Sequence, residues 1–474
     1  MEKKHLLIGF AIAAVVILII ASVVVYSTVT RSTEVSYTLV GFDPDGAYAD
    51  MQALCAIGPR VAGTQEDEQS AEYVQGKFTE AGLSNVHIET PQVTTYKINS
   101  AEMSLITLSI RGQVVKDYTH LDDFVLYEYS GSTNGILRLE IVNGGNGSEE
   151  ALSAIDCNGK AIITTLQCLP RAVEHGARAV IVQNLRLGEH YDYPPYQGGI
   201  YAGDDNGDSI PYPDGYPDAI VPTCAVSKAV GDEILNAIDS IGTIPIVGIS
   251  RVWIQLNFDT TISKNPIYNV VGDVKGSKHP EQVVYFLAHR DCTYISPGAV
   301  DDLSGTVTIM EIARQMAKYK TERTVRFISL DAEEIGVIGA TEYAKAHEAE
   351  ITANGVFCIN FDMNDVNLAH VTSLDIWISN VSYKKKMTDI IDLMNEKHPD
   401  IKSAYKVNLT IGGGGPDDGP FRKRGVETAF AEGEWGSSWE YHTALDTIEY
   451  VSKDSWRLSG IIFGTLALDL AGQA

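Results

Sequence analysis

The sequence has little positive charge. It contains 36 lysines and arginines against 62 aspartates and glutamates, so its formal net charge is −26 at pH 7. Nucleic acids are polyanions that attract basic surfaces, and this balance therefore argues against a nucleic-acid partner. The charge favours solubility but carries no information about the fold.

Cysteine is also scarce, with six residues in 474 and no CxxC or zinc-ribbon spacing. A zinc site built from thiolates is therefore not predicted. Cys157, Cys168 and Cys224 lie in one segment and could form a disulfide outside the cytoplasm. Buried free thiols are the simpler alternative for all six.

Long apolar runs are absent except near the amino terminus. Residues 6–25 are almost wholly apolar, and no charge follows until Arg31. Twenty such residues can span a hydrocarbon core of about 30 Å, and Lys3 and Lys4 before them predict that the amino terminus stays inside. We therefore predict a transmembrane anchor at 1–30, with the remainder extracytoplasmic. A cleaved signal peptide and a secreted protein are the alternative, although the apolar part of a signal peptide is usually only about 7–15 residues long.

The rest of the chain divides by its patterns. We predict a spacer at 31–45, the first part of a main domain at 46–119, an inserted domain at 120–255 and the second part of the main domain at 256–474. Strands and helices alternate in this last part. Such alternation predicts an α/β domain with a mixed, mostly parallel sheet and helices on both faces.

Residues that can bind metal follow the predicted strands of the last part. They are His289, Asp301, Glu333, Glu334, Asp362 and His442. The carboxyl ends of parallel strands meet at one edge of a sheet, so we expect these side chains to converge. Each alone is weak evidence, but together they would leave several acids beside buried strands. Such burial costs several kcal/mol unless a cation compensates it.

Two metal ions fit this set better than one. Two divalent ions carry four positive charges, which three carboxylates and one hydroxide would balance, and two neutral imidazoles would complete the coordination. Carboxylate and imidazole without cysteine indicate zinc, with cobalt or manganese as substitutes. A pair of ions activates water, and one of the neighbours Glu333 and Glu334 would stay free to accept its proton.

Five ordered motifs resemble those of the co-catalytic di-zinc aminopeptidase family. They are His289-x-Asp291, Pro-Gly-Ala-x-Asp301-Asp302-x-Ser-Gly, Glu333-Glu334-x-Gly, Asn360-Phe-Asp362-Met and Tyr441-His442-Thr. Relatives of this family include bacterial leucyl aminopeptidases, glutamate carboxypeptidase and the transferrin receptor. The resemblance covers nearly everything after residue 45 and implies the zinc exopeptidase fold. Residues 120–255 resemble the β-rich protease-associated (PA) domain that some members carry as an insertion.

The resemblance also implies roles for individual residues. Asp301 would bridge both zinc ions, and Glu333 would be the general base. The remaining ligands would be His289 and Asp362 for one ion, and Glu334 and His442 for the other. Asp291 and Asp302 would support the ligands, Tyr441 would stabilise the oxyanion, and the peptide bond Asp301-Asp302 would be cis. The sequence departs from the family pattern at Arg290 and in the acidic, glycine-preceded stretch 416–421.

The predicted function is that of a zinc-dependent exopeptidase, an aminopeptidase acting on peptides with a free amino terminus. The expected partners are these peptides and the membrane, and a homodimer is left open. A carboxypeptidase or dipeptidase of the glutamate carboxypeptidase type is one alternative, for which Arg422, Lys423 and Arg424 could bind the substrate carboxylate. A non-catalytic, receptor-like homologue is another, but none of the ligands is missing. A glutaminyl cyclase is disfavoured because those relatives hold one zinc and lack the Asp-x-Ser-Gly pattern.

Overall fold

The apolar segment 283–288 forms most of strand β13 (His279–His289), an inner strand of an eight-stranded sheet. The structure is a computed structural model that describes residues 37–109, 112–166, 168–185, 194–198, 202–203, 209–210, 220–241, 252–365, 373–433 and 440–473. The predicted anchor at 1–30 and the spacer up to residue 36 lie outside the described residues. Among those described, no helix has the length and apolar character needed to cross a membrane.

The sheet that contains β13 is mixed, as predicted. Across the sheet its strands are β1 (Ser84–Glu89), β12 (Asn269–Val274), β14 (Arg323–Leu330), β13, β15 (Gly355–Phe361), β18 (Thr428–Gly433), β16 (Ser373–Ile378) and β17 (Lys406–Ile411). The central strands β14, β13, β15 and β18 run parallel, whereas β1, β12 and β16 each meet a neighbour in antiparallel orientation. The carboxyl ends of the four parallel strands therefore lie at one edge.

Helices cover both faces of this sheet. They are α2 (Pro44–Cys55), α3 (Gln65–Glu80), α7 (Leu303–Met316), α8 (Ile338–Ala346), α9 (Glu348–Asn354), α10 (Lys384–Lys397), α11 (Pro399–Ala404), α12 (Gly419–Arg422) and α13 (Lys453–Ala471).

Successive side chains of β13 point to opposite faces of the sheet, so the strand packs against one layer of side chains on each face. The ring of Tyr285 lies 5.2 Å from that of Phe421 in α12. Its neighbour Phe286 points to the other face and stacks toward Phe361, which in turn meets Phe463 of α13 at 5.1 Å. A strand buried on both faces has no polar alternation, and this accounts for the continuous apolar run in the sequence.

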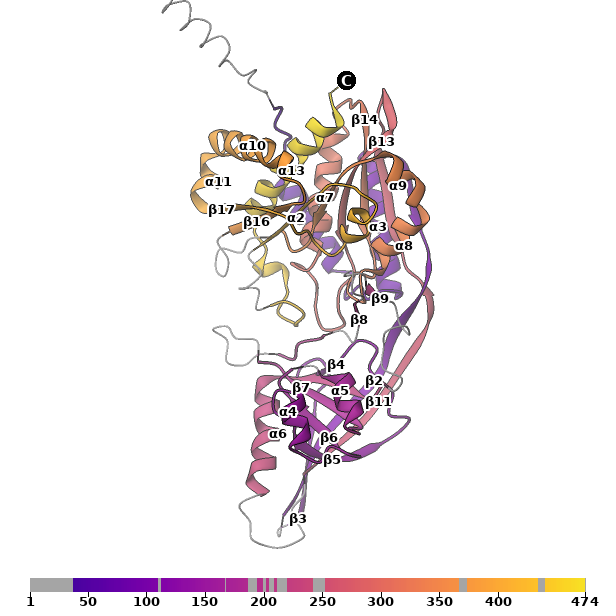
Figure 1. Cartoon of the computed structure of the whole chain (residues 1–474), viewed down its shortest axis with the longest axis vertical. Coiled ribbons are helices and arrows are strands. Elements are labelled where there is room, and N and C mark those ends of the chain that lie inside the picture. The colour runs from indigo at the N-terminus through magenta and orange to yellow at the C-terminus, as the bar shows by residue number, and fades with distance from the viewer. Residues whose placement is uncertain are drawn as a thin grey trace, which may run out of the picture. The chain divides into compact units, whose positions relative to one another are not determined.

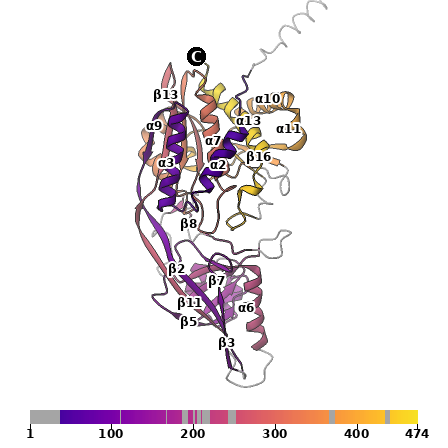
Figure 2. The same ribbon diagram turned by 180° about the vertical axis from the view of Figure 1, so that it is seen from behind.

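A second eight-stranded sheet is built from residues 92–266. Its strands in order are β3 (Gly112–Tyr118), β2 (Gln92–Ser109), β11 (Val252–Pro266), β5 (Leu137–Asn143), β6 (Ala161–Thr164), β7 (Ala179–Gln183), β10 (Thr223–Val226) and β4 (Phe124–Leu126). The long strands β2 and β11 pair from Gln92 with Pro266 to Thr107 with Val252, and they are visible as a ribbon in Figures 1 and 2. The sheet therefore extends on both sides of residues 120–255, and the domain boundaries stay a prediction.

Three helices pack on the second sheet, α4 (Glu149–Ser153), α5 (Leu169–Glu174) and α6 (Lys228–Ile241). Cys157 and Cys168 are buried in the core beneath α4 and α5, whereas Cys224 is buried with α6 on the opposite face. All six cysteines are free, and the disulfide considered among these three is not formed. Because β10 separates Cys224 from the other two, no pair with Cys224 could form without rearranging the sheet.

The side chain of Arg290 ties α3 to the carboxyl ends of the central strands. It is fully buried. Its guanidinium donates to Asp67 and Ser70 at 2.8 Å each, reaches Asp331 at 3.5 Å, and donates to the backbone oxygen of Leu330 at 3.3 Å. This departure from the family pattern thus has a structural role, since one cation neutralises part of a buried acidic pair.

We expect Arg290→Met to destabilise the fold by about 3–5 kcal/mol, because Asp67 and Asp331 would lose their buried cation. The free energy of unfolding is measured by urea denaturation. Arg138, an exposed arginine that donates to Gln255 on the second sheet, provides the matched control. Arg138→Met should change stability by no more than about 0.5 kcal/mol. Equal, small losses in both variants would contradict this role for Arg290.

Candidate metal centre

Most of the predicted ligands lie at or just beyond the end of an element. His289 is the last residue of β13, and Asp301 lies directly before the cap of α7. Glu334 follows β14, Asp362 follows β15, and His442 follows the segment after β18. Segments separated by more than 150 residues in the sequence therefore meet at the carboxyl edge of the sheet. All of the predicted site residues come together there.

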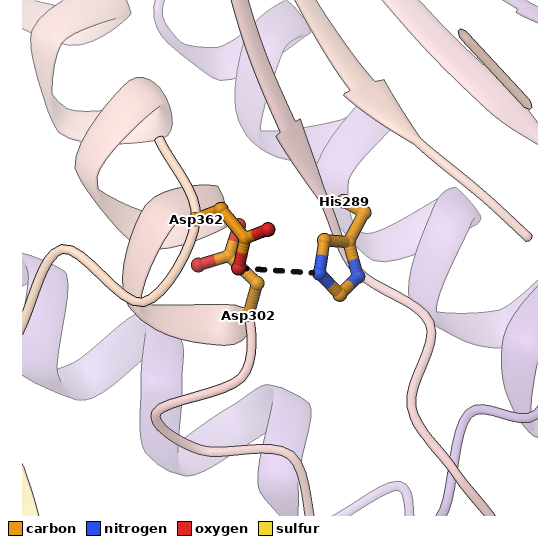
Figure 3. A group of neighbouring side chains, drawn as sticks. All are labelled: His289, Asp302 and Asp362. Carbon is orange, nitrogen blue, oxygen red and sulfur yellow. Dashed lines mark ion pairs between the residues drawn. The ribbon is translucent and has the colours of Figure 1, made fainter. Parts of the chain in front are cut away.

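These side chains form two neighbouring groups. His289, Asp302 and Asp362 make one, and Asp301, Glu334 and His442 make the other; the ligand atoms within each group lie within 4.8 Å of one another. Figure 3 shows the carboxylates of Asp302 and Asp362 beside the imidazole of His289, whose Nε2 is 3.8 Å from Asp362 Oδ1.

The two oxygens of Asp301 face different groups. Oδ1 lies 3.3 Å from His289 Nε2, and Oδ2 lies 3.2 Å from His442 Nε2. His442 Nε2 is also 2.8 Å from Glu334 Oε2. A carboxylate shared between two ions needs this arrangement. The expected cis peptide bond Asp301-Asp302 is present.

Asp302 is more constrained than Asp301. Its Oδ1 accepts from the backbone N–H groups of Gly305 and Met363, each at 2.9 Å, and from the Ser304 hydroxyl at 3.2 Å. It thereby caps α7 and fixes the loop after β15. Proximity alone groups Asp302 with His289, but one of its oxygens is saturated by donors while both oxygens of Asp301 face imidazoles. Asp301 is therefore the better shared ligand, and Asp302 the better support.

An oxygen on the far side of each imidazole orients it. Asp291 Oδ1 lies 3.4 Å from His289 Nδ1, and the Asp291 carboxylate also accepts from the backbone N–H groups of Glu333 and Glu334. His442 Nδ1 is 2.8 Å from the backbone oxygen of Gln197. With an oxygen beside each Nδ1, both Nε2 atoms point into the site, as they do in histidines that bind metal.

Several polar atoms in the site are buried without a hydrogen-bond partner among the described residues. They include Nε2 of His289, Nε2 of His442, Oδ2 of Asp301 and Oε1 of Glu334. A buried polar atom that makes no hydrogen bond costs about 1–3 kcal/mol, and more if it is charged. The set combines imidazole nitrogen with carboxylate oxygen, which is the donor chemistry that zinc takes. The residues present therefore fit zinc.

The electrostatics follow from burial and crowding. Burial is the largest influence on Glu334, and with Asp301 beside it and His442 opposing the shift, its pKa rises to about 7. Burial also raises the pKa of Glu333 well above its ordinary value, opposed by His289 and reinforced by Asp362. Asp301 differs, because its contacts with His289 and His442 outweigh burial and leave its pKa lowered. Asp301 is therefore the acid most firmly held in the ionised form.

A cavity of about 410 Å³ opens directly onto the site. Its lining residues are Asp301, Glu333, Asp362, Trp377, Gly413, Gly414, Pro416, Phe430, Glu432 and Tyr441. The ring of Tyr441 stacks on that of His442 at 3.7 Å. The predicted base Glu333 and the predicted oxyanion donor Tyr441 thus both border the space that a substrate would enter.

Three functional contacts in the site escape prediction from the sequence. The carboxylate of Asp446 accepts from the backbone N–H groups of Val300 at 2.7 Å and Asp301 at 3.1 Å, so it positions the shared ligand. Gln197 reaches His442 from 245 residues away along the chain. Glu432 lies on the cavity wall. Of these three residues, only Asp446 could have been suspected from the sequence, because it is an acid four residues after His442.

We expect Gln197→Leu to weaken zinc binding about 10- to 100-fold, the usual effect of losing an outer-shell partner. The Gln197 side chain is fully buried, and it donates to Tyr96 Oη at 2.8 Å and to the backbone oxygen of Leu126 at 3.0 Å. These bonds fix the backbone oxygen that orients His442. Zinc affinity is measured by competition with a chelator. Gln255→Leu on the second sheet is the control, and equal affinity in both variants would contradict the positioning role.

In this chain, residues that can bind metal lie together at the carboxyl edge of a mixed α/β sheet. This arrangement is that of metallohydrolases with a zinc exopeptidase fold. Residues 269–466 match the model of peptidase family M28. The predicted relationship is confirmed.

Similar proteins extend over most of the chain. It is 24% identical to Aminopeptidase YwaD of Bacillus subtilis (strain 168), covering 88% of this chain and 83% of that one. It is 24% identical to Carboxypeptidase Q of Mus musculus, covering 62% of this chain and 60% of that one. The solved structure of BSAP, a zinc aminopeptidase from Bacillus subtilis, has a TM-score of 0.68 at 20% identity and covers 91% and 96% of the two chains. The Peptidase M28 precursor of Shewanella amazonensis has a TM-score of 0.71 at 20% identity, covering 90% and 93%. These structures confirm the fold.

Proposed function

We propose that the protein is a zinc-dependent aminopeptidase that removes residues from peptides with a free amino terminus. The observation that carries this proposal is Asp301, whose two oxygens face His289 and His442 at 3.3 and 3.2 Å. The relatives that bear the name aminopeptidase support it, and so does the acidic cavity beside these residues.

Two zinc ions would be held by the residues that the sequence indicated. His289 and Asp362 would bind one, Glu334 and His442 would bind the other, and Asp301 would bind both. When bound, such ions polarise the scissile carbonyl and lower the pKa of water toward about 7. Cobalt or manganese could substitute on the same donor set.

Glu333 is the proposed general base and acid. It lies on the cavity wall, and its backbone N–H donates to Asp291 Oδ1 at 3.1 Å, so its position is fixed by the residue that also supports His289. Burial raises the pKa of its carboxyl well above the ordinary value, which suits a group that takes a proton from water and returns it to the leaving amine.

Tyr441 is the proposed oxyanion donor. It borders the cavity, and burial raises the pKa of its hydroxyl well above its ordinary value. The hydroxyl therefore keeps its proton and can donate a hydrogen bond to charge that develops on the carbonyl oxygen.

The charge of the cavity favours an aminopeptidase over a carboxypeptidase. Among the described residues that line it there are four acids and no lysine or arginine, so it suits an ammonium group better than a carboxylate. Two of the three basic residues considered for a carboxylate have partners outside the lining of the cavity. Arg422 Nε lies 2.9 Å from Asp418 Oδ1, and Arg424 donates to the backbone oxygen of Pro420.

Two further parts of the proposal concern organisation. Residues 120–255, with the second sheet, are proposed to form a PA domain, supported by the parallel strands β5, β6, β7 and β10 beneath short helices. A membrane anchor at 1–30 with an extracytoplasmic catalytic part rests on the apolar run at residues 6–25.

The test compares three versions of one peptide. One has both termini free, one has an acetylated amino terminus, and one has an amidated carboxyl terminus. An aminopeptidase releases the first residue from the free and amidated peptides and leaves the acetylated one intact. Release of the last residue, or equal cleavage of the acetylated peptide, would contradict the assignment.

A further inference from the structure

One wall of the cavity comes from a face of strands β16 and β18. These strands are antiparallel, and their register places Trp377 opposite Phe430 and Asp375 opposite Glu432. Side chains alternate between faces along a strand, so all four lie on the same face. The rings of Trp377 and Phe430 are 5.5 Å apart. An aromatic pair therefore lies next to an acidic pair.

The glycine-rich segment 412–415 packs against this aromatic pair and borders the cavity. Gly413 and Gly414 line the cavity. A Cβ at Gly413, where φ is 81°, would lie 3.2 Å from the Trp377 ring, and a Cβ at Gly415 would lie 2.4 Å from Phe430. Glycine here lets the backbone approach the aromatic pair closely. This packing accounts for a part of the sequence that the catalytic proposal leaves unused.

Glu432 is the one acid lining the cavity to which the proposed mechanism gives no role. Among the described residues its carboxylate has no hydrogen bond or ion pair, whereas the carboxylate of Asp375 opposite it accepts from Asn408 at 2.7 Å. Like charges opposite each other on a sheet are unfavourable. A cation in the cavity beside Glu432 would relieve this crowding.

We propose that Glu432 determines specificity by binding the ammonium or guanidinium group of a basic first residue, whose methylene stem packs against Trp377 and Phe430. This inference rests on the proposed aminopeptidase function and names its substrate class as peptides that begin with lysine or arginine. The cavity volume of about 410 Å³ lies within the range of about 300–1,000 Å³ for small-ligand sites. Lysine and arginine combine an apolar stem with a charged tip, as this wall requires.

A rival role for Glu432 is to bind the α-ammonium group, which every substrate carries. The two roles predict different results. If Glu432 binds the side chain of the first residue, its loss lowers activity only on peptides that begin with a basic residue. If it binds the α-ammonium group, its loss lowers activity on all peptides by the same factor.

The experiment measures kcat/KM of the full chain for lysyl, arginyl and norleucyl p-nitroanilides, since norleucine has a similar stem without the charge. In Glu432→Gln, the loss for the lysyl and arginyl substrates should exceed the loss for the norleucyl substrate by roughly 10- to 100-fold, the size of a charge-assisted hydrogen bond. Glu427→Gln, just before β18, is the matched control and should leave the lysyl-to-norleucyl ratio unchanged. An equal loss on all three substrates, or an unchanged ratio in Glu432→Gln, would overturn the inference.

If the wild-type chain hydrolyses none of these anilides, the aminopeptidase proposal fails, but the subsite can still be tested by binding. Calorimetry with zinc-loaded protein should then show tighter binding of lysine amide than of norleucine amide, and Glu432→Gln should remove the difference. Equal binding of the two amides to the wild type would overturn the inference independently of turnover.

Discussion

We expect Glu333→Gln to lower kcat by about 10²- to 10⁴-fold, the usual contribution of a general base, with little change in KM or in zinc content. Glutamine has nearly the same shape but cannot accept the proton. Glu333 borders the cavity. The residue that lies 2.8 Å from His442 is its neighbour Glu334. Steady-state kinetics and metal analysis on the same preparation provide the measurement.

Glu334→Gln gives the contrast. It removes a proposed zinc ligand one residue away, so it should lower zinc content as well as activity. If Glu333→Gln lost zinc to the same extent as Glu334→Gln, the two neighbours would share a role, and the division into base and ligand would be wrong.

The second large effect is expected for Asp301→Asn. A carboxamide carries no charge and offers only one oxygen ligand, so it cannot replace a carboxylate whose two oxygens face His289 and His442. We expect zinc content to fall to one ion per chain or fewer and kcat/KM to fall by more than about 10²-fold, the upper end of outer-shell effects. Metal analysis after dialysis and an activity assay check both.

The fold should survive this substitution, because the backbone N–H of Asp301 still donates to Asp446. Circular dichroism of the dialysed variant tests that point. Asp400→Asn serves as the control, since Asp400 is an exposed carboxylate that pairs with Arg457 on α11 and α13. Full zinc content in Asp301→Asn would contradict the shared-ligand role.

The main sheet and most of the proposed site could be predicted from the sequence because both follow from local rules. The run at 283–288 is apolar because both faces of β13 are covered, and ligands that follow parallel strands must meet at one edge. The ordered motifs then separated this site from a chance collection of acids.

The cavity wall formed by strands β16 and β18 could not be predicted from the sequence, because it depends on pairing between distant strands. Strand β18 lies between β15 and β16, and β16 runs antiparallel to it. Neither fact is encoded in the pattern of either strand. Without that register, Trp377 and Glu432 are an unrelated aromatic residue and acid.

Contacts between segments that are distant in the sequence could not be predicted either. Gln197 belongs to a loop rich in tyrosine, proline and glycine, and nothing in that composition indicates that its backbone orients His442. Arg290 appeared in the sequence only as a departure from a family pattern. The structural role of Arg290 depends on α3, because this helix carries Asp67, which is 223 residues away in the sequence.

The most direct test of the account is a zinc titration of metal-free protein, followed by hydrolysis of a peptide with a free amino terminus. The account predicts that activity is absent without metal, saturates at two zinc ions per chain, and does not reach that level in Asp301→Asn. Full activity in the metal-free protein, or saturation at a single ion, would contradict it.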